Sequence, residues 1–247
     1  MRITNTVGYV LGTGIAGALA CGAAAQSQPA STHEMQWYFT ETVQVNSMKG
    51  GADSLVALNQ TLSVDLTPNL TASMNLPLYA QSGQTSLGNV QLGVEYDAYS
   101  GNGWDVDLTA GVYIPVGEEF FRNENVNPYL GGVFNTKIAG LDFSQSLEYT
   151  FVGGSSYFVP LAGRTDSDLL SLGTGLYYNW NSFKFGAELD QYYYVDTGEK
   201  QLFLGPTAKW SVASNVDLSI GIGIPVYQDV MTAESNAIVT AGFGIKF

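Results

Sequence analysis

Acidic residues dominate the side chains of this chain that could do chemistry. The sequence holds 22 Asp and Glu against 9 Lys and Arg, which gives a formal net charge of -13. Several acids are spaced by two, as in Asp105 and Asp107 or Glu188 and Asp190. On a strand this spacing places both carboxylates on one face, where they could support acid–base chemistry or attract cations. The charge balance argues against a nucleic-acid-binding protein, which needs a basic face.

An enzyme would need more than paired acids. The single His, His33, lies in a polar segment, 26–34, ahead of the first predicted strand, and Cys21 is the single Cys. One Cys permits neither an intrachain disulfide framework nor a Cys-rich zinc site. A His-dependent hydrolase would lack a positioned base. We therefore predict no enzymatic activity, no metal and no cofactor.

The elements that must position the acids are strands with a period of two. One example has Trp104, Val106, Leu108, Ala110, Val112 and Ile114 on one face. The pattern predicts twelve strands, at roughly 35–45, 54–66, 70–79, 88–99, 104–115, 128–138, 141–151, 168–180, 183–195, 201–212, 216–226 and 236–247. Short connections of turn-forming residues alternate with longer, more polar ones, of which 152–167 is the longest. This alternation predicts hairpin turns at one end and loops at the other.

An even number of strands with short turns at one end is typical of a transmembrane β-barrel. The predicted fold class is therefore all-β, an antiparallel up-and-down barrel over 35–247 with twelve strands, ten or fourteen being the alternatives. A soluble sandwich or lipocalin-like barrel would instead turn its apolar faces inward. We favour the membrane barrel because its inner faces would be rich in Gly, Ser, Thr, Asp and Tyr. The four tryptophans also fall at the short-turn end, as an interfacial girdle requires; they are Trp37, Trp104, Trp180 and Trp210.

Residues 1–25 have the pattern of a secretory signal peptide. A single early charge, Arg2, precedes an uncharged stretch that ends in Ala23-Ala24-Ala25, an A-x-A type cleavage site. Two alternatives are a lipoprotein signal acylated at Cys21 and a retained membrane anchor. Export and a barrel fold together predict the outer membrane of a Gram-negative-type bacterium, with its lipids as partners.

Two stretches of the sequence resemble known outer-membrane proteins. The last strand ends in alternating apolar residues and a terminal Phe247, which resembles the signal read by the outer-membrane assembly machinery. Residues 87–96, LGNVQLGVEY, and 109–117, TAGVYIPVG, resemble a transporter-like family named for the meta-cleavage pathway of phenol degradation. Asn89 stands where that family has Asp, and Val116 where it has Thr. The resemblance implies a barrel that moves small, often hydrophobic, molecules, and it carries over no binding residue.

Strand parity assigns ten acids and three bases to the inner wall. The acids expected to govern selectivity are Glu95, Asp97, Asp105, Asp107, Asp142, Glu148, Glu188 and Asp190; Asp65, Asp217, Lys184, Lys209 and Lys246 complete the set. Rings of Asp and Glu favour cations in pores. We expect a passive channel for small solutes with an acidic, cation-favouring lumen. The alternative is a structural or surface-interaction barrel with an occluded lumen.

Three finer expectations concern the interior. Asp97 and Asp105 flank one tight hairpin and are expected to face each other. Five tyrosines are expected on the inner wall, as filling or as a stacking surface for a solute; they are Tyr99, Tyr113, Tyr177, Tyr192 and Tyr194. Loop 152–167 is unusually apolar and is expected to fold into the pore, where Arg164 would reach Glu148 or Glu188.

Overall fold

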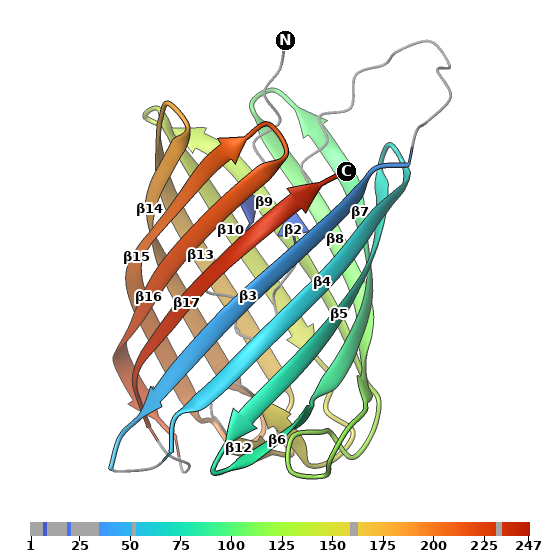
Figure 1. Cartoon of the computed structure of the whole chain (residues 1–247), viewed down its shortest axis with the longest axis vertical. Helices are drawn as coiled ribbons and strands as arrows, with labels where there is room; N and C mark the ends of the chain where they lie inside the picture. Colours follow the sequence, from blue (N-terminus) through green and yellow to red (C-terminus); the bar gives the residue numbers. More distant parts are fainter. Residues whose placement is uncertain (1–6, 9–18, 21–34, 51–52, 159–162, 231–233) are drawn as a thin grey trace.

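In the computed structural model, twelve antiparallel strands close into a barrel (Figure 1). The structure describes residues 7–8, 19–20, 35–50, 53–158, 163–230 and 234–247. The wall strands are β3 (Trp37–Met48), β4 (Leu55–Thr67), β5 (Leu70–Gln81), β7 (Asn89–Gly101), β8 (Trp104–Pro115), β9 (Asn127–Ile138), β10 (Leu141–Thr150), β13 (Leu169–Trp180), β14 (Phe183–Tyr194), β15 (Lys200–Ala213), β16 (Val216–Asp229) and β17 (Ser235–Lys246). All twelve predicted strands are therefore confirmed.

Each wall strand pairs with its neighbours in sequence, and the ring closes between the first and the last. β17 pairs with β3, from Lys246 opposite Tyr38 to Ser235 opposite Met48. One short strand, β6 (Gln84–Leu87), extends β5 as a hairpin at the long-loop end. Closure leaves no unpaired strand edge for lipid to meet.

Four further short strands lie outside the wall, in two pairs. β1 (Val7–Gly8) pairs with β2 (Leu19–Ala20) within the predicted signal peptide, and β11 (Ser156–Phe158) pairs with β12 (Gly163–Thr165) in the longest loop. The predicted cleavage after Ala25, the alternative at Cys21, the polar segment 26–34 and His33 lie outside the described residues. Among the described residues, no helix has the length and apolar character needed to cross a membrane.

The alternating sequence turns its apolar side chains outward. On β3, Val43 is 42% exposed and Val45 is exposed, whereas Gln44 between them is 2% exposed. The same outward apolar face recurs at Leu218, Ile220, Ile222 and Ile224 on β16. A soluble barrel would bury these side chains in its core, so the soluble alternative is wrong and the outer face is suited to lipid.

Polar residues on the outer face are paired with each other. The Gln60 amide donates to the Glu41 carboxylate across β3 and β4 (2.9 Å), and the Thr174 hydroxyl donates to the Gln145 amide oxygen across β10 and β13 (2.8 Å). These pairs explain how otherwise apolar strands accommodate side chains that do not fit the pattern, because a paired polar group costs less in an apolar medium than a free one.

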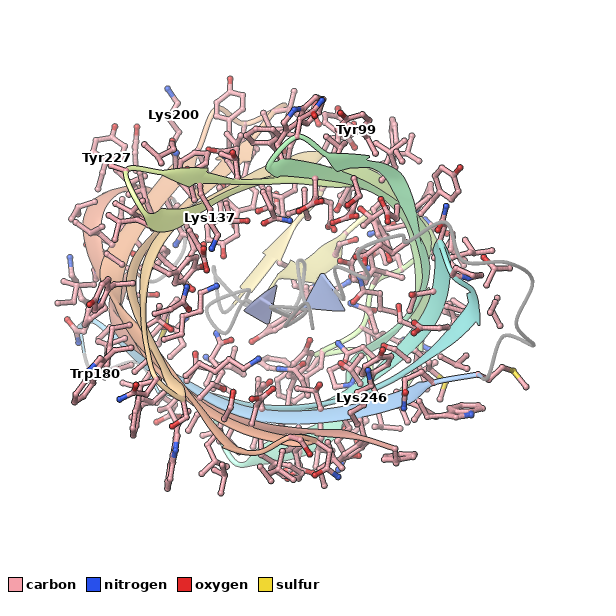
Figure 2. All side chains as sticks on the ribbon, turned by 90° about the horizontal axis from the view of Figure 1, so that it is seen from above. Tyr99, Lys137, Trp180, Lys200, Tyr227 and Lys246 are labelled. Atoms are coloured by element: carbon pink, nitrogen blue, oxygen red, sulfur yellow. The ribbon has the colours of Figure 1, made fainter. Side chains whose placement is uncertain are left out.

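The four tryptophans lie at one rim and face outward, as predicted. Trp104 stacks on Tyr99 at 4.1 Å between ring centroids, and Trp210 stacks on Phe183 at 5.6 Å. Figure 2 shows Trp180 and Tyr99 on the outside of the ring. The short turns at this end use backbone with positive φ, at Asn102 (54°) and Gly103 (84°) for example, as tight hairpin turns require.

Candidate channel lumen

The acid-rich part of the inner wall lies on β7 and β8, near the short turns. Glu95 and Asp97 project inward from β7, and Asp105 and Asp107 project inward from β8, so strand parity placed all four correctly. Asp97 lies opposite Asp107, and Asp105 lies opposite Ser100. The expectation that Asp97 and Asp105 face each other is therefore wrong.

A β-bulge on β7 is the physical reason for that error. The register shifts between Asp97 and Tyr99. Their partners Asp107 and Val106 are adjacent on β8, whereas one extra residue, Ala98, lies between them on β7. The bulge reverses the facing of every later residue on the strand. It places Ser100 inside, where its hydroxyl donates to Asp105 (2.6 Å), and it turns Tyr99 outward onto Trp104. The prediction of Tyr99 on the inner wall is wrong for the same reason.

Within the described ranges, no base forms an ion pair with this acidic wall. The four ion pairs found among the described residues involve none of Glu95, Asp97, Asp105 and Asp107. Asp107 is 3% exposed, and its Oδ2 atom has no hydrogen-bond partner in the described chain. Asp65, on the neighbouring β4, accepts hydrogen bonds from the Thr71 hydroxyl (2.8 Å) and the Tyr38 hydroxyl (3.0 Å).

Basic side chains of the lumen gather on the remaining wall, from β9 to β17. Asp142 on β10 lies 3.1 Å from Lys184 Nζ and 3.6 Å from Lys137 Nζ. Lys209 on β15 pairs with Asp217 on β16 at 2.9 Å. Sequence parity did not identify Lys137 as an inner residue, because its strand carries apolar residues on both faces. Asp142 is therefore a partner for bases and differs in setting from the acids of β7 and β8.

Lysine ammonium groups on this wall also approach tyrosine rings. Lys184 lies 4.6 Å from the centroid of the Tyr177 ring, and Lys246 lies 5.3 Å from that of Tyr38. A cation over an aromatic face at such a distance gains electrostatic stabilisation.

The three acids of the middle lumen are bound by tyrosines or adjoin one another. Glu148 on β10 accepts hydrogen bonds from the Tyr113 hydroxyl (3.2 Å) and the Thr150 hydroxyl (3.3 Å). Glu188 on β14 accepts one from the Tyr177 hydroxyl (2.7 Å), and Asp190 follows on the same face. These two tyrosines hold carboxylates in place.

An apolar cluster covers the inner wall on the side of β13 to β17, toward the long loops. It contains Leu169, Tyr192, Tyr194, Phe203 and Ile238, with Val152 and Val230 packed against it. Tyr192 and Tyr194 thus fill space among apolar neighbours, which is the filling role that the sequence favoured.

Two long loops fold into the barrel on the other side. Phe121, from loop 116–127, and Tyr157, from β11, pack against the inner-wall residues Leu55, Ala57 and Tyr79. The Tyr157 hydroxyl donates to the Gln81 side chain (2.9 Å). Burial raises the pKa of the Tyr157 phenol, so this donor keeps its proton. The inward folding of loop 152–167 is confirmed at Tyr157; Pro160 and Leu161 lie outside the described residues.

Arg164 holds these two loops together. Its guanidinium donates to the backbone oxygens of Glu119 (2.6 Å), Arg122 (2.8 Å) and Ser155 (2.7 Å), and to the Ser155 hydroxyl (2.8 Å). The expected contact with Glu148 or Glu188 is wrong, because backbone oxygens of the loops take up the guanidinium donors. Most of these acceptors are main-chain atoms, which residue types alone do not reveal.

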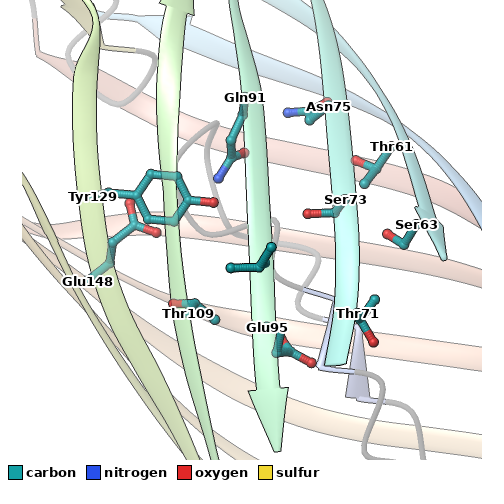
Figure 3. A pocket seen from close by; sticks show the side chains of 11 residues that line it. Thr61, Ser63, Thr71, Ser73, Asn75, Gln91, Glu95, Thr109, Tyr129 and Glu148 are labelled. Atoms are coloured by element: carbon teal, nitrogen blue, oxygen red, sulfur yellow. The ribbon is translucent and has the colours of Figure 1, made fainter. Parts of the chain in front are cut away.

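A recess in the wall lies between the acids and the loops (Figure 3). It spans β4 to β10 and is partly open to the lumen; its lining residues are Thr61, Ser63, Thr71, Ser73, Asn75, Gln91, Val94, Glu95, Thr109, Tyr129 and Glu148. A Cβ at Gly93 or Gly111 would collide with the Tyr129 hydroxyl, so these two glycines let the ring lie across β7 and β8. Sequence reasoning named Glu95 and Glu148 of this lining and missed the other residues, because they are uncharged, commonplace types on five strands.

A comparison with protein-family models identifies one family. Residues 31–241 match the family described as "Putative MetA-pathway of phenol degradation". The chain belongs to this family. The family resemblance inferred from residues 87–96 and 109–117 is thereby confirmed over most of the chain. A comparison with curated protein sequences finds no significant match.

Solved structures with a similar fold include two porins and an outer membrane channel. The NanC porin aligns with a TM-score of 0.62 at 13% identity, over 84% of this chain and all of that one. The COG4313 outer membrane channel from Pseudomonas putida F1 aligns with 0.61 at 10% identity, over 90% and 100%. The KdgM porin aligns with 0.58 at 11% identity, over 85% and 99%. The closed barrel and its apolar outer face place the chain in the bacterial outer membrane, and these solved structures share its fold.

Proposed function

We propose that the protein is a passive outer-membrane channel for small solutes whose lumen favours cations. The observation that carries the proposal is the wall of β7 and β8, where Glu95, Asp97, Asp105 and Asp107 face the interior without an ion-pair partner in the described chain. Like charges in a confined space of lowered dielectric repel each other strongly. Water and mobile cations relieve that repulsion, and such acids are how pores favour cations.

The bases do not cancel this preference, because they are engaged elsewhere. Lys137 and Lys184 share Asp142, and Lys209 has Asp217. A permeating cation therefore meets carboxylates without ion-pair partners on one wall. A permeating anion meets three lysines that already have carboxylate partners, besides Lys246 over the Tyr38 ring. Diffusion of this kind needs no catalytic group, and we expect no enzymatic activity from the paired acids.

An occluded barrel is the second candidate, and the inward-folded loops favour it. Phe121 and Tyr157 occupy part of the interior at the long-loop end, held there by Arg164. If these loops close the lumen completely, the wall acids would be solvated side chains that fill the interior and select no ions. The barrel would then serve a structural or surface-interaction role.

Single-channel recording in planar bilayers separates the two candidates. We expect discrete conductance steps from the full-length mature barrel. At low salt the conductance should fall less than in proportion to concentration, because wall acids hold a local excess of cations when the Debye length exceeds about 10 Å. Absence of conductance, both in the wild type and after deletion of 153–165, would refute the channel and support the occluded barrel.

Assembly by the outer-membrane machinery is a further part of the proposal, and Phe247 supplies its test. The Phe247 and Trp37 backbones exchange two hydrogen bonds of 3.0 Å where the barrel closes, while the Phe247 side chain is 62% exposed. Phe247→Ala keeps both backbone bonds and removes only the ring. If the ring is read by the assembly machinery, this variant should accumulate unassembled in the periplasm of cells. Normal insertion of Phe247→Ala would show that Phe247 contributes only to closing the barrel between β3 and β17.

A further inference from the structure

We propose that Asn89 anchors both inward-folded loops to the barrel wall, and that its side-chain amide thereby sets the width of the pore. The inference deepens the proposed channel function and rests on it for the role in pore width. Asn89 is the first residue of β7, at the long-loop end, and is 7% exposed. The Arg164 guanidinium ties the two loops to each other, whereas Asn89 ties them to the wall.

Asn89 and Asn123 form a reciprocal pair of hydrogen bonds between β7 and loop 116–127. The Asn89 Nδ2 atom donates to the Asn123 Oδ1 atom (2.8 Å), and the Asn123 backbone N–H donates to the Asn89 Oδ1 atom (2.7 Å). Asn123 is 3% exposed, so both bonds are shielded from water. Such bonds are costly to break, because the buried groups that they leave behind find no water to replace the lost partner.

The Asn123 side chain also holds the second loop. Its Oδ1 atom accepts a hydrogen bond from the Tyr157 backbone N–H (3.1 Å) in addition to the one from Asn89. The oxygen keeps both donors only while the Asn123 amide stays in this orientation, and the Asn89 donor fixes that orientation. Asn89 therefore controls the position of Tyr157 through Asn123.

The anchored loops bear the aromatic rings that fill the interior at this end. The Phe121 ring packs on Tyr79 at 5.8 Å between ring centroids and on Tyr157 at 5.4 Å. Gly88 leaves room for the Tyr79 ring, because a Cβ at that position would collide with it. The residue before the anchor thus seats the rings, and the anchor fixes the loops that carry Phe121 and Tyr157.

Position 89 needs a side chain that both donates and accepts. A carboxylate would still accept from the Asn123 backbone N–H, but it has no proton to donate. Its second oxygen would face the Asn123 Oδ1 atom, so the Asn123 amide would turn round to donate instead. The Tyr157 backbone N–H would then lose its acceptor. Asn89→Asp should therefore free the second loop and keep the first, whereas Asn89→Ala should free both.

Amide hydrogen exchange, measured by NMR on the full-length mature barrel in detergent, tests the anchor without requiring conductance. The probes are the backbone N–H groups of Asn123 and Tyr157. In Asn89→Asp, exchange of Tyr157 should accelerate about fivefold or more, as expected for a lost buried hydrogen bond, and exchange of Asn123 should change less than about twofold. In Asn89→Ala both should accelerate. Unchanged exchange of Tyr157 in both variants, or equal acceleration of the two amides in Asn89→Asp, would overturn the proposal.

Asn59→Asp is the matched control for the added charge. Asn59 is also a buried Asn of the inner wall, 8% exposed, but it lies on β4 and its Oδ1 atom has no hydrogen-bond partner in the described chain. Exchange of Tyr157 in Asn59→Asp should match the wild type. The same acceleration as in Asn89→Asp would assign the effect to the new carboxylate and overturn the role of the Asn89 donor.

Exclusion of polyethylene glycols of graded size from the conducting pore tests the consequence for pore width. Asn89→Ala should admit larger glycols than the wild type, and Asn59→Asp should keep the wild-type limit. An unchanged limit in Asn89→Ala would refute the role of Asn89 in pore width. A wild type without conductance would refute the channel, while the exchange rates would still decide on the anchor. If Asn89→Ala loses the heat-modifiable gel mobility of a folded barrel, the isosteric Asn89→Asp decides.

Discussion

The two ends of the barrel interior hold different chemistry. The wall near the short turns carries carboxylates without ion-pair partners on β7 and β8, while lysines on β9, β14 and β15 at the same end pair with Asp142 and Asp217. The wall near the long loops is covered by two aromatic and aliphatic clusters, one of which includes Phe121 and Tyr157 from the loops themselves. We therefore propose that one end selects by charge and the other restricts by size.

The two ends of the barrel are also held in place by different interactions. The short-turn end relies on the strand ladder, with tight hairpins that leave little chain to move. The long-loop end relies on side chains, above all the Arg164 guanidinium and its four acceptors. Changes to single residues should therefore alter the geometry of the long-loop end and the charge of the short-turn end.

The largest effect is expected from Arg164→Ala. Hydrogen bonds to charged groups contribute about 1.5–3 kcal/mol each, so their loss should release loops 116–127 and 152–167 from each other. We expect larger and noisier single-channel conductance with unchanged ion preference. Lys200→Ala, at the outer end of β15, is the control that removes a positive charge without touching the loops. Unchanged conductance in Arg164→Ala would show that the loops do not set the pore size.

The next effect concerns the acids. Combined Asp97→Asn, Asp105→Asn and Asp107→Asn should lower the cation preference without unfolding the barrel, because like charges are removed. One charge at 4 Å is worth about 1 kcal/mol even in bulk water, so the permeability ratio should fall by about fivefold or more. The control neutralises three exposed loop acids, Asp53, Glu118 and Glu119. An equal fall in that control would assign the preference to overall charge.

Asp142 should behave in the opposite way to the acids of β7 and β8. Asp142→Asn leaves Lys137 and Lys184 without their carboxylate. Their charges then face the lumen uncompensated, and anions should gain permeability by about two- to fivefold, one charge being worth about 1 kcal/mol at 4 Å. Reversal potentials of this single variant test the assignment. If Asp142→Asn lowers the cation preference only as much as Asp97→Asn does, the two lysines do not contribute to ion selectivity.

The smallest effect is a response to alkaline pH at the long-loop end. Burial raises the pKa of Tyr157 above its ordinary value of about 10. The Tyr157 phenol would lose its proton at lower pH in the released loop than in the packed loop. The packing of the loop is therefore fully stable below about pH 10 and weakens as the pH rises further. Conductance should increase there in the wild type. Tyr157→Phe cannot ionise and should lack this increase; the same increase in that variant would assign it to another group.

Strand parity predicted the wall well and the irregular features poorly. The twelve strands, their closure and the inward facing of the acids follow from a period of two, which a barrel imposes on every strand. Tyr99 was misplaced because one extra residue on β7 reverses parity without any sign in the residue types. Lys137 was missed because its strand has no clear apolar face. The partners of Arg164 are mostly backbone oxygens, and the recess assembles hydroxyls from separate strands, so only the folded chain reveals them.

The most direct test of the central claim is the reversal potential of the wild-type channel in a tenfold gradient of potassium chloride. The acidic wall predicts a potential of the sign that favours potassium over chloride. It also predicts that the preference weakens as the Debye length shrinks from about 10 Å at 0.1 M to about 3 Å at 1 M. Equal permeability of the two ions at low salt, or a preference for chloride, would contradict the account.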